Sequence, residues 1–184
     1  MRLALINSTI VAGTVTFSVV LTSTLAGFAF AKLRFRGRNG LLGLVVATMM
    51  VPPQLGIIPL YIMMAQWFGW NDHLAAVIVP ALVNAFGVFF MRQYLVGAFP
   101  AELLDAGRVD GASTLRIWWN LVLPVARPAA AVLGLLTFMT AWNDFFYPIV
   151  VLTGALISTL PMLVVFGLMG RQILGGIMQG AVKG

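Results

Sequence analysis

Long stretches without charged residues constrain this sequence more than any other feature. No Asp, Glu, Lys or Arg occurs in 3–31, 39–71 or 74–91, and 128–170 contains only Asp144. A helix needs about 20 apolar residues to cross the hydrocarbon of a bilayer. With 61% hydrophobic and 9% charged residues, a soluble fold of this size would leave its surface largely apolar. The sequence therefore predicts a polytopic transmembrane helical bundle of the all-α class.

The charge-free stretches also give the expected limits of the spans. The fourth stretch is too long for one crossing and barely long enough for two, so we expect it to cross twice. The chain is then a single transmembrane domain, 1–184, with five spans. The expected spans are about 5–31, 41–68, 74–95, 128–152 and 154–174.

The basic residues orient these spans. Apart from Arg2, every Lys and Arg lies in the last turn of the first, third or fifth expected span or in the segment after it. Connections rich in Lys and Arg usually lie in the cytoplasm, so we expect these segments and the C-terminus to be cytoplasmic. The connection around His73 is then external. The net charge of +6 reflects this topology and does not indicate a nucleic-acid partner.

Residues for catalysis are scarce. The sequence has no Cys, one His and five acidic residues, which excludes a Cys-ligated metal. We expect Asp72 and His73 to be surface residues of an external loop. An intramembrane enzyme is one alternative function, but it would need a dyad, paired acids or a metal cluster within the membrane. A channel or a carrier that works alone is another, and carriers usually place several ionisable groups at mid-membrane.

The segment 99–120, between the third and fourth spans, predicts a helix–turn–helix elbow on the cytoplasmic face. Pro100 suits the first turn of a helix, and Glu102 complements the dipole of that helix. Asp110 and Gly111 form a turn signal before the second helix. The elbow either joins two spans and does nothing else, or it receives another protein.

This elbow resembles the EAA loop of ABC importer permeases. That loop usually reads Glu-Ala-Ala, then Asp-Gly-Ala, then Leu-Pro. The corresponding residues here are Asp105–Ala106–Gly107, Asp110–Gly111–Ala112 and Leu123–Pro124. Other motifs resemble the carbohydrate branch, the maltose-type permeases, along nearly the whole chain, and they lie at Asn7–Ser8, 33–37, 50–52, 58–61, 142–145 and 180–184.

The resemblance to this family, the inner membrane components of binding-protein-dependent transport systems, implies a function. It implies a permease of the bacterial inner membrane for a sugar or oligosaccharide delivered by an extracytoplasmic binding protein. It also implies a heterodimer with a second permease and two ATPase subunits, which hold the ATP and Mg. The chain has no Gly-x-x-x-x-Gly-Lys-Ser/Thr pattern, so we expect neither enzyme activity nor a cofactor of its own. The implied coupling residues are Glu102, Asp105, Ala106, Gly107, Asp110, Gly111 and Ala112.

Two further features predict a translocation path. Asp144 lies in an apolar stretch, where a charge costs about 2.5–3.5 kcal/mol at the bilayer centre, so it should face protein or water. With Trp142 and Asn143 it either lines the sugar path or pairs with a neighbouring helix near the external interface. Pro52 and Pro53 interrupt the second span and produce either a structural kink or a bend along a cavity.

The family resemblance also indicates segments that this sequence lacks. Relatives have six spans, and nothing before Asn7 corresponds to their first. Thr153 reads as the end of one helix and Gly154 as the beginning of the next, which leaves no room for the external segment of relatives. We therefore expect missing segments before 7 and near 153/154, the second a break of a few tens of residues.

Overall fold

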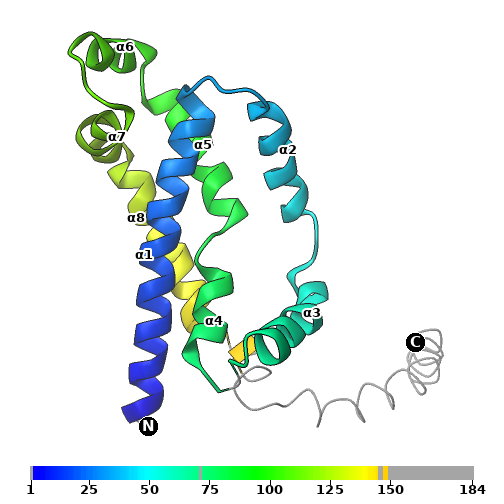
Figure 1. Cartoon of the computed structure of the whole chain (residues 1–184). Helices are drawn as coiled ribbons and strands as arrows, with labels where there is room; N and C mark the ends of the chain where they lie inside the picture. The colour runs from blue at the N-terminus through cyan, green and yellow to red at the C-terminus, as the bar shows by residue number, and fades with distance from the viewer. Residues whose placement is uncertain (1, 71, 145–146, 149–184) are drawn as a thin grey trace, which may run out of the picture.

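Helix α1 (Arg2–Lys32) runs along most of the length of the helical bundle (Figure 1). Helices α5 (Ala85–Ala98) and α8 (Leu123–Asn143) pack along it, and α2 (Arg38–Met49) packs against α5. The structure is a computed structural model that describes residues 2–70, 72–144 and 147–148. Because the described part is a bundle of apolar helices, the predicted all-α transmembrane class is confirmed.

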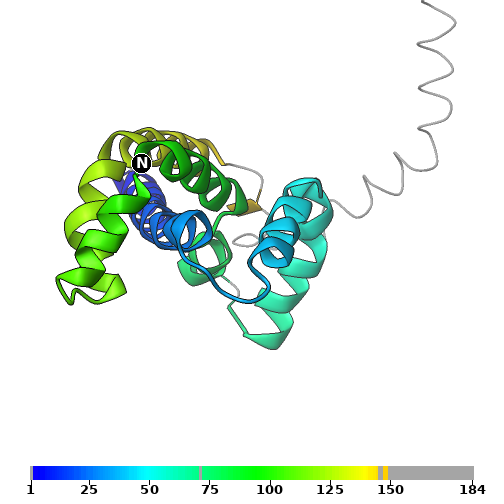
Figure 2. The same ribbon diagram turned by 90° about the horizontal axis from the view of Figure 1, so that it is seen from above.

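The core forms where α1, α5 and α8 meet. Its most buried side chains come from all three helices and from the segment that leads into α8, and they include Val19, Met91, Leu95, Phe99, Val122 and Leu133. Figure 2 shows α2 and α3 (Ile57–Ile62) set to one side of this group. In the described residues, the packed core therefore holds three helices together and leaves α2 without a buried residue.

Small residues bring α1 and α5 into close contact. A Cβ atom added to Gly27 would lie 2.7 Å from the Cβ of Met91 and 2.9 Å from the backbone nitrogen of Arg92. One added to Gly87 would collide with the side chain of Ser23. Lipid is as apolar as a helix surface, so helices in membranes associate largely through such close packing.

Three helical stretches in the described residues are long and apolar enough to cross a membrane. They are Leu5–Lys32, Leu74–Ala98 and Thr114–Asn143. A fourth candidate consists of two helical parts that meet at 92°, Arg38–Met49 and Pro53–Trp67. The expected span 154–174 lies outside the described residues, as do the expected break near 153/154 and the end of the span 128–152.

The bend in the second span occurs at the expected prolines. Helix α2 ends before Pro52, and the 3-10 turn η1 (Pro53–Gly56) begins the next part, which continues through α3 and the π turn η2 (Met63–Trp67). Neither proline can donate a backbone hydrogen bond, and each disfavours helical geometry in the residue before it.

The third span is also interrupted, which the sequence analysis did not predict. Helix α4 (Leu74–Ala81) contains Pro80 near its end, and α5 begins only at Ala85. The carbonyl oxygen of Leu82 accepts hydrogen bonds from Ser18 Oγ at 2.9 Å and Thr22 Oγ1 at 3.5 Å. Side chains of α1 thus replace part of the hydrogen bonding that the break removes.

The helical stretch that contains the beginning of the fourth expected span starts well before residue 128. Helix α7 (Thr114–Ile117), the π turn η3 (Trp118–Val122) and α8 form one helical stretch. The π turn lies directly before Pro124, which has no N–H and would crowd the preceding turn of a regular α-helix. Pro124 and Pro128 therefore lie inside this stretch and do not mark its beginning.

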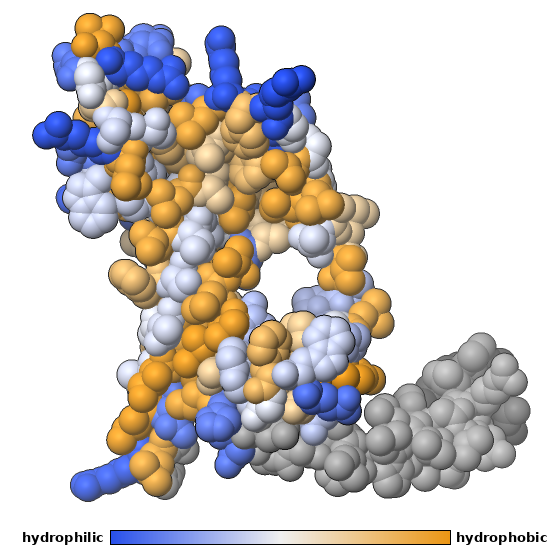
Figure 3. Space-filling view, viewed as in Figure 1, coloured by the Kyte–Doolittle hydropathy of each residue, from blue (hydrophilic) through white to orange (hydrophobic). Residues whose placement is uncertain are grey.

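The polar end of the molecule carries helix α6 (Ala101–Val109). Helices α6 and α7 lie at the same end as the connection between α1 and α2 (Figure 1). Hydrophilic surface gathers at this end, smaller hydrophilic patches lie at the opposite end, and apolar surface covers most of the length between them (Figure 3). This distribution is that of a membrane protein with a polar elbow outside the hydrocarbon.

Candidate functional site

The elbow turns at Gly111. Its φ of 71° lies in the left-handed region, which glycine adopts without steric cost. The N–H of Gly111 donates to the carbonyl of Arg108 at 3.0 Å, and the N–H of Ala112 donates to that of Gly107 at 2.9 Å. These two bonds form a Schellman motif, which ends α6 and satisfies its last carbonyls.

One face of the elbow packs on the bundle. Gly107 is buried against Ile117, and a Cβ added to Gly107 would lie 3.0 Å from the Cγ1 of Ile117. Leu104 is buried on the same helix. The hydroxyl of Ser113 accepts the N–H of Arg116 at 3.3 Å and so caps α7. The two short helices therefore have a fixed arrangement.

The opposite face of the elbow is free within the described residues. Glu102, Asp105, Ala106, Asp110 and Gly111 are exposed, whereas Ala112 is half-buried. Asp105 forms an exposed ion pair with Arg108 at 3.6 Å, a type of contact that contributes little to stability. Apolar side chains lie among these polar groups, and the most exposed of them are Val109, Leu115 and Trp119.

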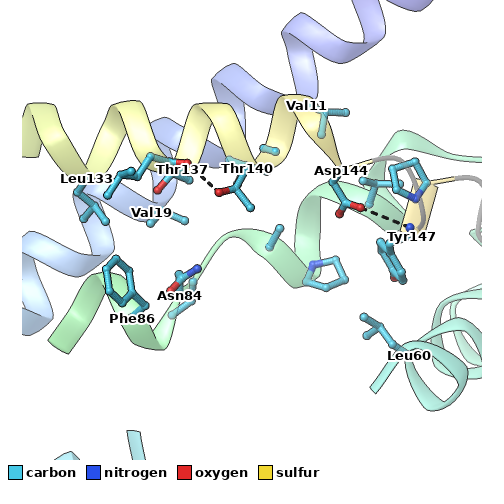
Figure 4. A pocket seen from close by; sticks show the side chains of 18 residues that line it. Val11, Val19, Leu60, Asn84, Phe86, Leu133, Thr137, Thr140, Asp144 and Tyr147 are labelled. Carbon is cyan, nitrogen blue, oxygen red and sulfur yellow. Dashed lines mark hydrogen bonds between the residues drawn. The ribbon is translucent and has the colours of Figure 1, made fainter. Parts of the chain in front are cut away.

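A hollow opens at the other end of the bundle (Figure 4). Its volume is about 570 Å³, and α1, the α4–α5 break, α8 and the residues after α8 surround it. We call it the outer hollow. Its polar lining is Asn84, Thr137, Thr140 and Asp144, and its aromatic lining is Phe86 and Tyr147.

A second hollow adjoins the first. It measures about 680 Å³ and is lined by η1 and the beginning of α3, including Pro53 and Gln54. Leu60, Asp144 and Tyr147 line both hollows. Asp144 therefore lies where two spaces meet, one beside the broken second span and one beside the broken third span.

The end of α8 positions Asp144. The helix ends at Asn143, and Asp144 follows with extended backbone angles, φ −72° and ψ 108°. Its Oδ1 lies 3.5 Å from the N–H of Tyr147, at the long limit of a hydrogen bond. The hydroxyl of Tyr147 donates to the carbonyl of Ala76 at 3.0 Å. This contact ties the segment after α8 to α4.

The structure separates the residues that the sequence grouped into one path. Asp144 and Pro53 line the hollows, but Trp142, Asn143 and Pro52 are not among the described residues that line them. Asn143 donates to the carbonyl of its own helix at Met139, 2.7 Å away, and Trp142 stacks on Phe138 with ring centroids 5.6 Å apart. Whether any of them contacts a solute stays a prediction.

Of the residues that line the outer hollow, the sequence predicted only Asp144, and it missed the polar side chains of Asn84, Thr137, Thr140 and Tyr147. Two of them, Thr137 and Thr140, precede Asp144 by seven and four residues, a spacing that places all three on one helix face. This spacing could have predicted that Thr137 and Thr140 accompany Asp144. Asn84 caps α5 by accepting a hydrogen bond from the N–H of Gly87 at 3.1 Å. It could not be predicted as a cap, because the sequence did not indicate that a helix begins there. Tyr147 joins the hollow through tertiary contact.

The backbone of the α4–α5 break faces the outer hollow. Ala81, Val83 and Asn84 line it. Irregular backbone at membrane depth is tolerated where protein buries it or where a water-filled cavity passes. In the described part of the chain, no three His, Cys, Asp or Glu residues form a group that could hold a metal ion. The described lining of the outer hollow therefore offers hydrogen-bonding groups but no cluster of metal ligands.

Interrupted apolar helices around a hollow with a few polar side chains, and an elbow at the opposite end, are features typical of helical membrane transport proteins. The family model described as "Binding-protein-dependent transport system inner membrane component" matches residues 18–182, and the chain belongs to this family. The family resemblance read from the elbow is thereby confirmed.

Individual relatives have similar sequences over most of the chain. The lactose transport system permease protein LacG of Rhizobium radiobacter is 32% identical over 96% of this chain and 74% of its own length. The arabinooligosaccharides transport system permease protein AraQ of Halalkalibacterium halodurans is 31% identical over 90% and 68%. The sn-glycerol-3-phosphate transport system permease protein UgpE of Yersinia pestis is 32% identical over 85% and 55%.

A solved structure shows the same arrangement. It is the crystal structure of a bacterial ABC transporter involved in the import of the acidic polysaccharide alginate. One of its chains is 29% identical and superposes with a TM-score of 0.72 over 79% of this chain. This chain spans about half of it, 51% of its length.

Proposed function

We propose that this chain is the permease subunit of an ATP-driven importer that carries a sugar or oligosaccharide across the bacterial inner membrane. The family match over residues 18–182 is the observation that carries this proposal. The names of LacG and AraQ support the substrate class, since both name sugar transport. A binding protein outside the cell delivers the solute in this proposal.

The elbow is the coupling element of the proposed importer. Its fixed turn and its exposed carboxylates and apolar side chains, between Glu102 and Trp119, suit contact with another protein. The proposed partner is one of two ATPase subunits, which bind ATP and Mg and hydrolyse the ATP. Residues 105–112 transmit the movement of that partner to the membrane helices.

The hollow around Asp144 is the part of the solute path that this chain contributes. Two broken spans meet beside it, as in transporters whose substrate sites form at discontinuous helices. A second, homologous permease completes the path as a heterodimer. The basic residues near the elbow support a cytoplasmic position for that end and for the C-terminus.

The substitution Gly111→Val tests the coupling role. Valine is strained at a φ of 71° and costs about 1–3 kcal/mol there, so the Schellman turn should open. We expect normal membrane insertion, reduced recovery of the ATPase subunits with the purified complex, and loss of solute-stimulated ATP hydrolysis. Gly97→Val is the matched control, because Gly97 is exposed on α5 and its added side chain meets open space.

Two results would contradict this proposal. Normal ATPase recovery and normal transport in Gly111→Val would show that the turn does not couple. Equal losses in Gly97→Val would show that the measurement reports general damage to the helices instead.

A further inference from the structure

We propose that Asp144 makes the outer hollow select against anionic solutes, so that this permease takes neutral or cationic ones. The inference rests on the proposed role of the hollow as a solute path. It concerns the charge of the solute, which membership of the family does not determine. The names of its relatives cover lactose, a glycerol phosphate and an acidic polysaccharide, which differ in charge.

The first argument is the distribution of charge. Asp144 is the only charged residue among the described residues that line either hollow, and it lines both. Its carboxylate is exposed, and no ion pair joins it to a basic residue in the described part of the chain. The remaining polar lining consists of the neutral side chains of Asn84, Thr137, Thr140 and Gln54. Nothing on these walls therefore offsets one negative charge.

The second argument is the chemistry of that lining. Carboxylate, amide and hydroxyl groups accept hydrogen bonds from the hydroxyl groups of a neutral sugar, and Phe86 and Tyr147 add aromatic surface. A phosphate or a uronate carries only acceptors on its charged group. It would bring a second negative charge to Asp144 and find no basic side chain on the described walls.

The size of the effect follows from helix geometry. Thr140 lies four residues before Asp144, which corresponds to about 6 Å along α8. At that distance in water, one unit charge changes the local concentration of a singly charged solute by a factor of about three. A cation is enriched by that factor and an anion is depleted by it, so their ratio at Thr140 should change about tenfold.

Cysteine chemistry can measure this ratio. The chain has no Cys of its own, so Thr140→Cys introduces a single thiol in this subunit. We would treat the whole transporter, in right-side-out membrane vesicles at about 10 mM salt to limit screening, with a cationic and an anionic methanethiosulfonate reagent of similar size. The partner subunits should carry no accessible cysteine. The cation-to-anion rate ratio should fall about tenfold when Asp144→Asn is added.

Two further variants make the result specific. Asp72→Asn removes one negative charge from the connection before α4, outside the described lining of both hollows, and should leave the ratio unchanged. Thr137→Cys places a second thiol on the same helix face and should show the same direction of change.

The outcomes separate this inference from the proposed path. If both reagents react at Thr140→Cys but Asp144→Asn leaves the ratio unchanged, charge selection is wrong and the path stands. If neither reagent reacts at Thr140→Cys or Thr137→Cys, the hollow is closed to water, and both the path and its selectivity are overturned.

Discussion

Single glycines set how closely α1 and α5 approach. Gly27 is pressed against the backbone of α5, whereas Gly13, on the same helix, has open space around its Cα. The two glycines look alike in the sequence, and only the packing of α5 distinguishes them. Contact at Gly27 is a property of two helices that are far apart in the chain.

The substitution Gly27→Ala should therefore destabilise the protein. Its added methyl group would lie within 3.0 Å of Met91 and Arg92 backbone or Cβ atoms, which forces the helices apart at a cost of about 1–3 kcal/mol. Gly13→Ala is the matched control and should be neutral. Denaturation of the purified complex by dodecyl sulfate, followed by circular dichroism, measures the difference. Equal stability of the two variants would mean that the α1–α5 contact is looser than described.

Local chemistry at Gly111 was readable from the sequence, in contrast to Gly27. Asp110 followed by Gly111 predicts a turn because glycine alone adopts the left-handed region freely, and this needs no knowledge of partners. The structure confirms the turn. The close contact at Gly27 could not be predicted, because the sequences of α1 and α5 do not show that these two helices pack against each other.

At the scale of elements, the break between α4 and α5 depends on α1. Ser18 donates to the carbonyl of Leu82 at 2.9 Å, and this carbonyl has no helical partner of its own. The hydroxyl of Thr22 also lies 3.5 Å from it, although its shortest hydrogen bond is to the carbonyl of Ser18 at 2.8 Å. An unsatisfied carbonyl in an apolar environment is costly, so these hydroxyl groups stabilise the interrupted span.

The double substitution Ser18→Ala with Thr22→Val should remove both donors. We expect the free energy of unfolding to fall by about 1–3 kcal/mol, the cost of leaving one buried acceptor unsatisfied. Thr9→Val is the control, because the hydroxyl of Thr9 is exposed and bonds only to Leu5 within its own helix. Dodecyl sulfate denaturation again measures stability. Comparable losses in the double variant and in Thr9→Val would argue against a special role at the break.

The limits of the elements show why sequence reasoning reached only part of the fold. Charge-free stretches predicted apolar helices where the described residues have them, because charges are costly in lipid whatever the tertiary structure. They did not locate the break after Pro80, which depends on hydroxyl groups of α1. They gave about residue 128 as the beginning of the fourth span, whereas the helical stretch begins at Thr114 and accommodates Pro124 after the π turn η3. The predicted path residues were incomplete for the same reason, since tertiary packing places Asn84 on the same hollow as Asp144 and ties Tyr147 to α4.

At the scale of the whole molecule, the charge distribution predicts the orientation in the membrane. Polar surface gathers at the elbow end (Figure 3), and the described connection around His73 joins two spans at the other end (Figure 1). In the proposed orientation, the elbow end is cytoplasmic and His73 is external.

Two cysteine variants check this orientation. His73→Cys should react with a membrane-impermeant maleimide in intact cells, and Asn39→Cys, at the beginning of α2, should react only after permeabilisation. The natural absence of Cys gives each variant one labelling site in this chain. The reverse pattern would place the elbow outside the cell and would exclude its contact with a cytoplasmic ATPase.

The helical stretch Thr114–Asn143 has its ends at the two proposed working parts of the molecule, the elbow turn and Asp144. Thirty residues of helix extend about 45 Å. A rod of that length acts as a lever: a tilt of about 5° about one end displaces the other by about 4 Å, more than the width of a water molecule. In the proposed importer, a small movement at the elbow is therefore large enough to open or narrow the solute path without any helix unfolding.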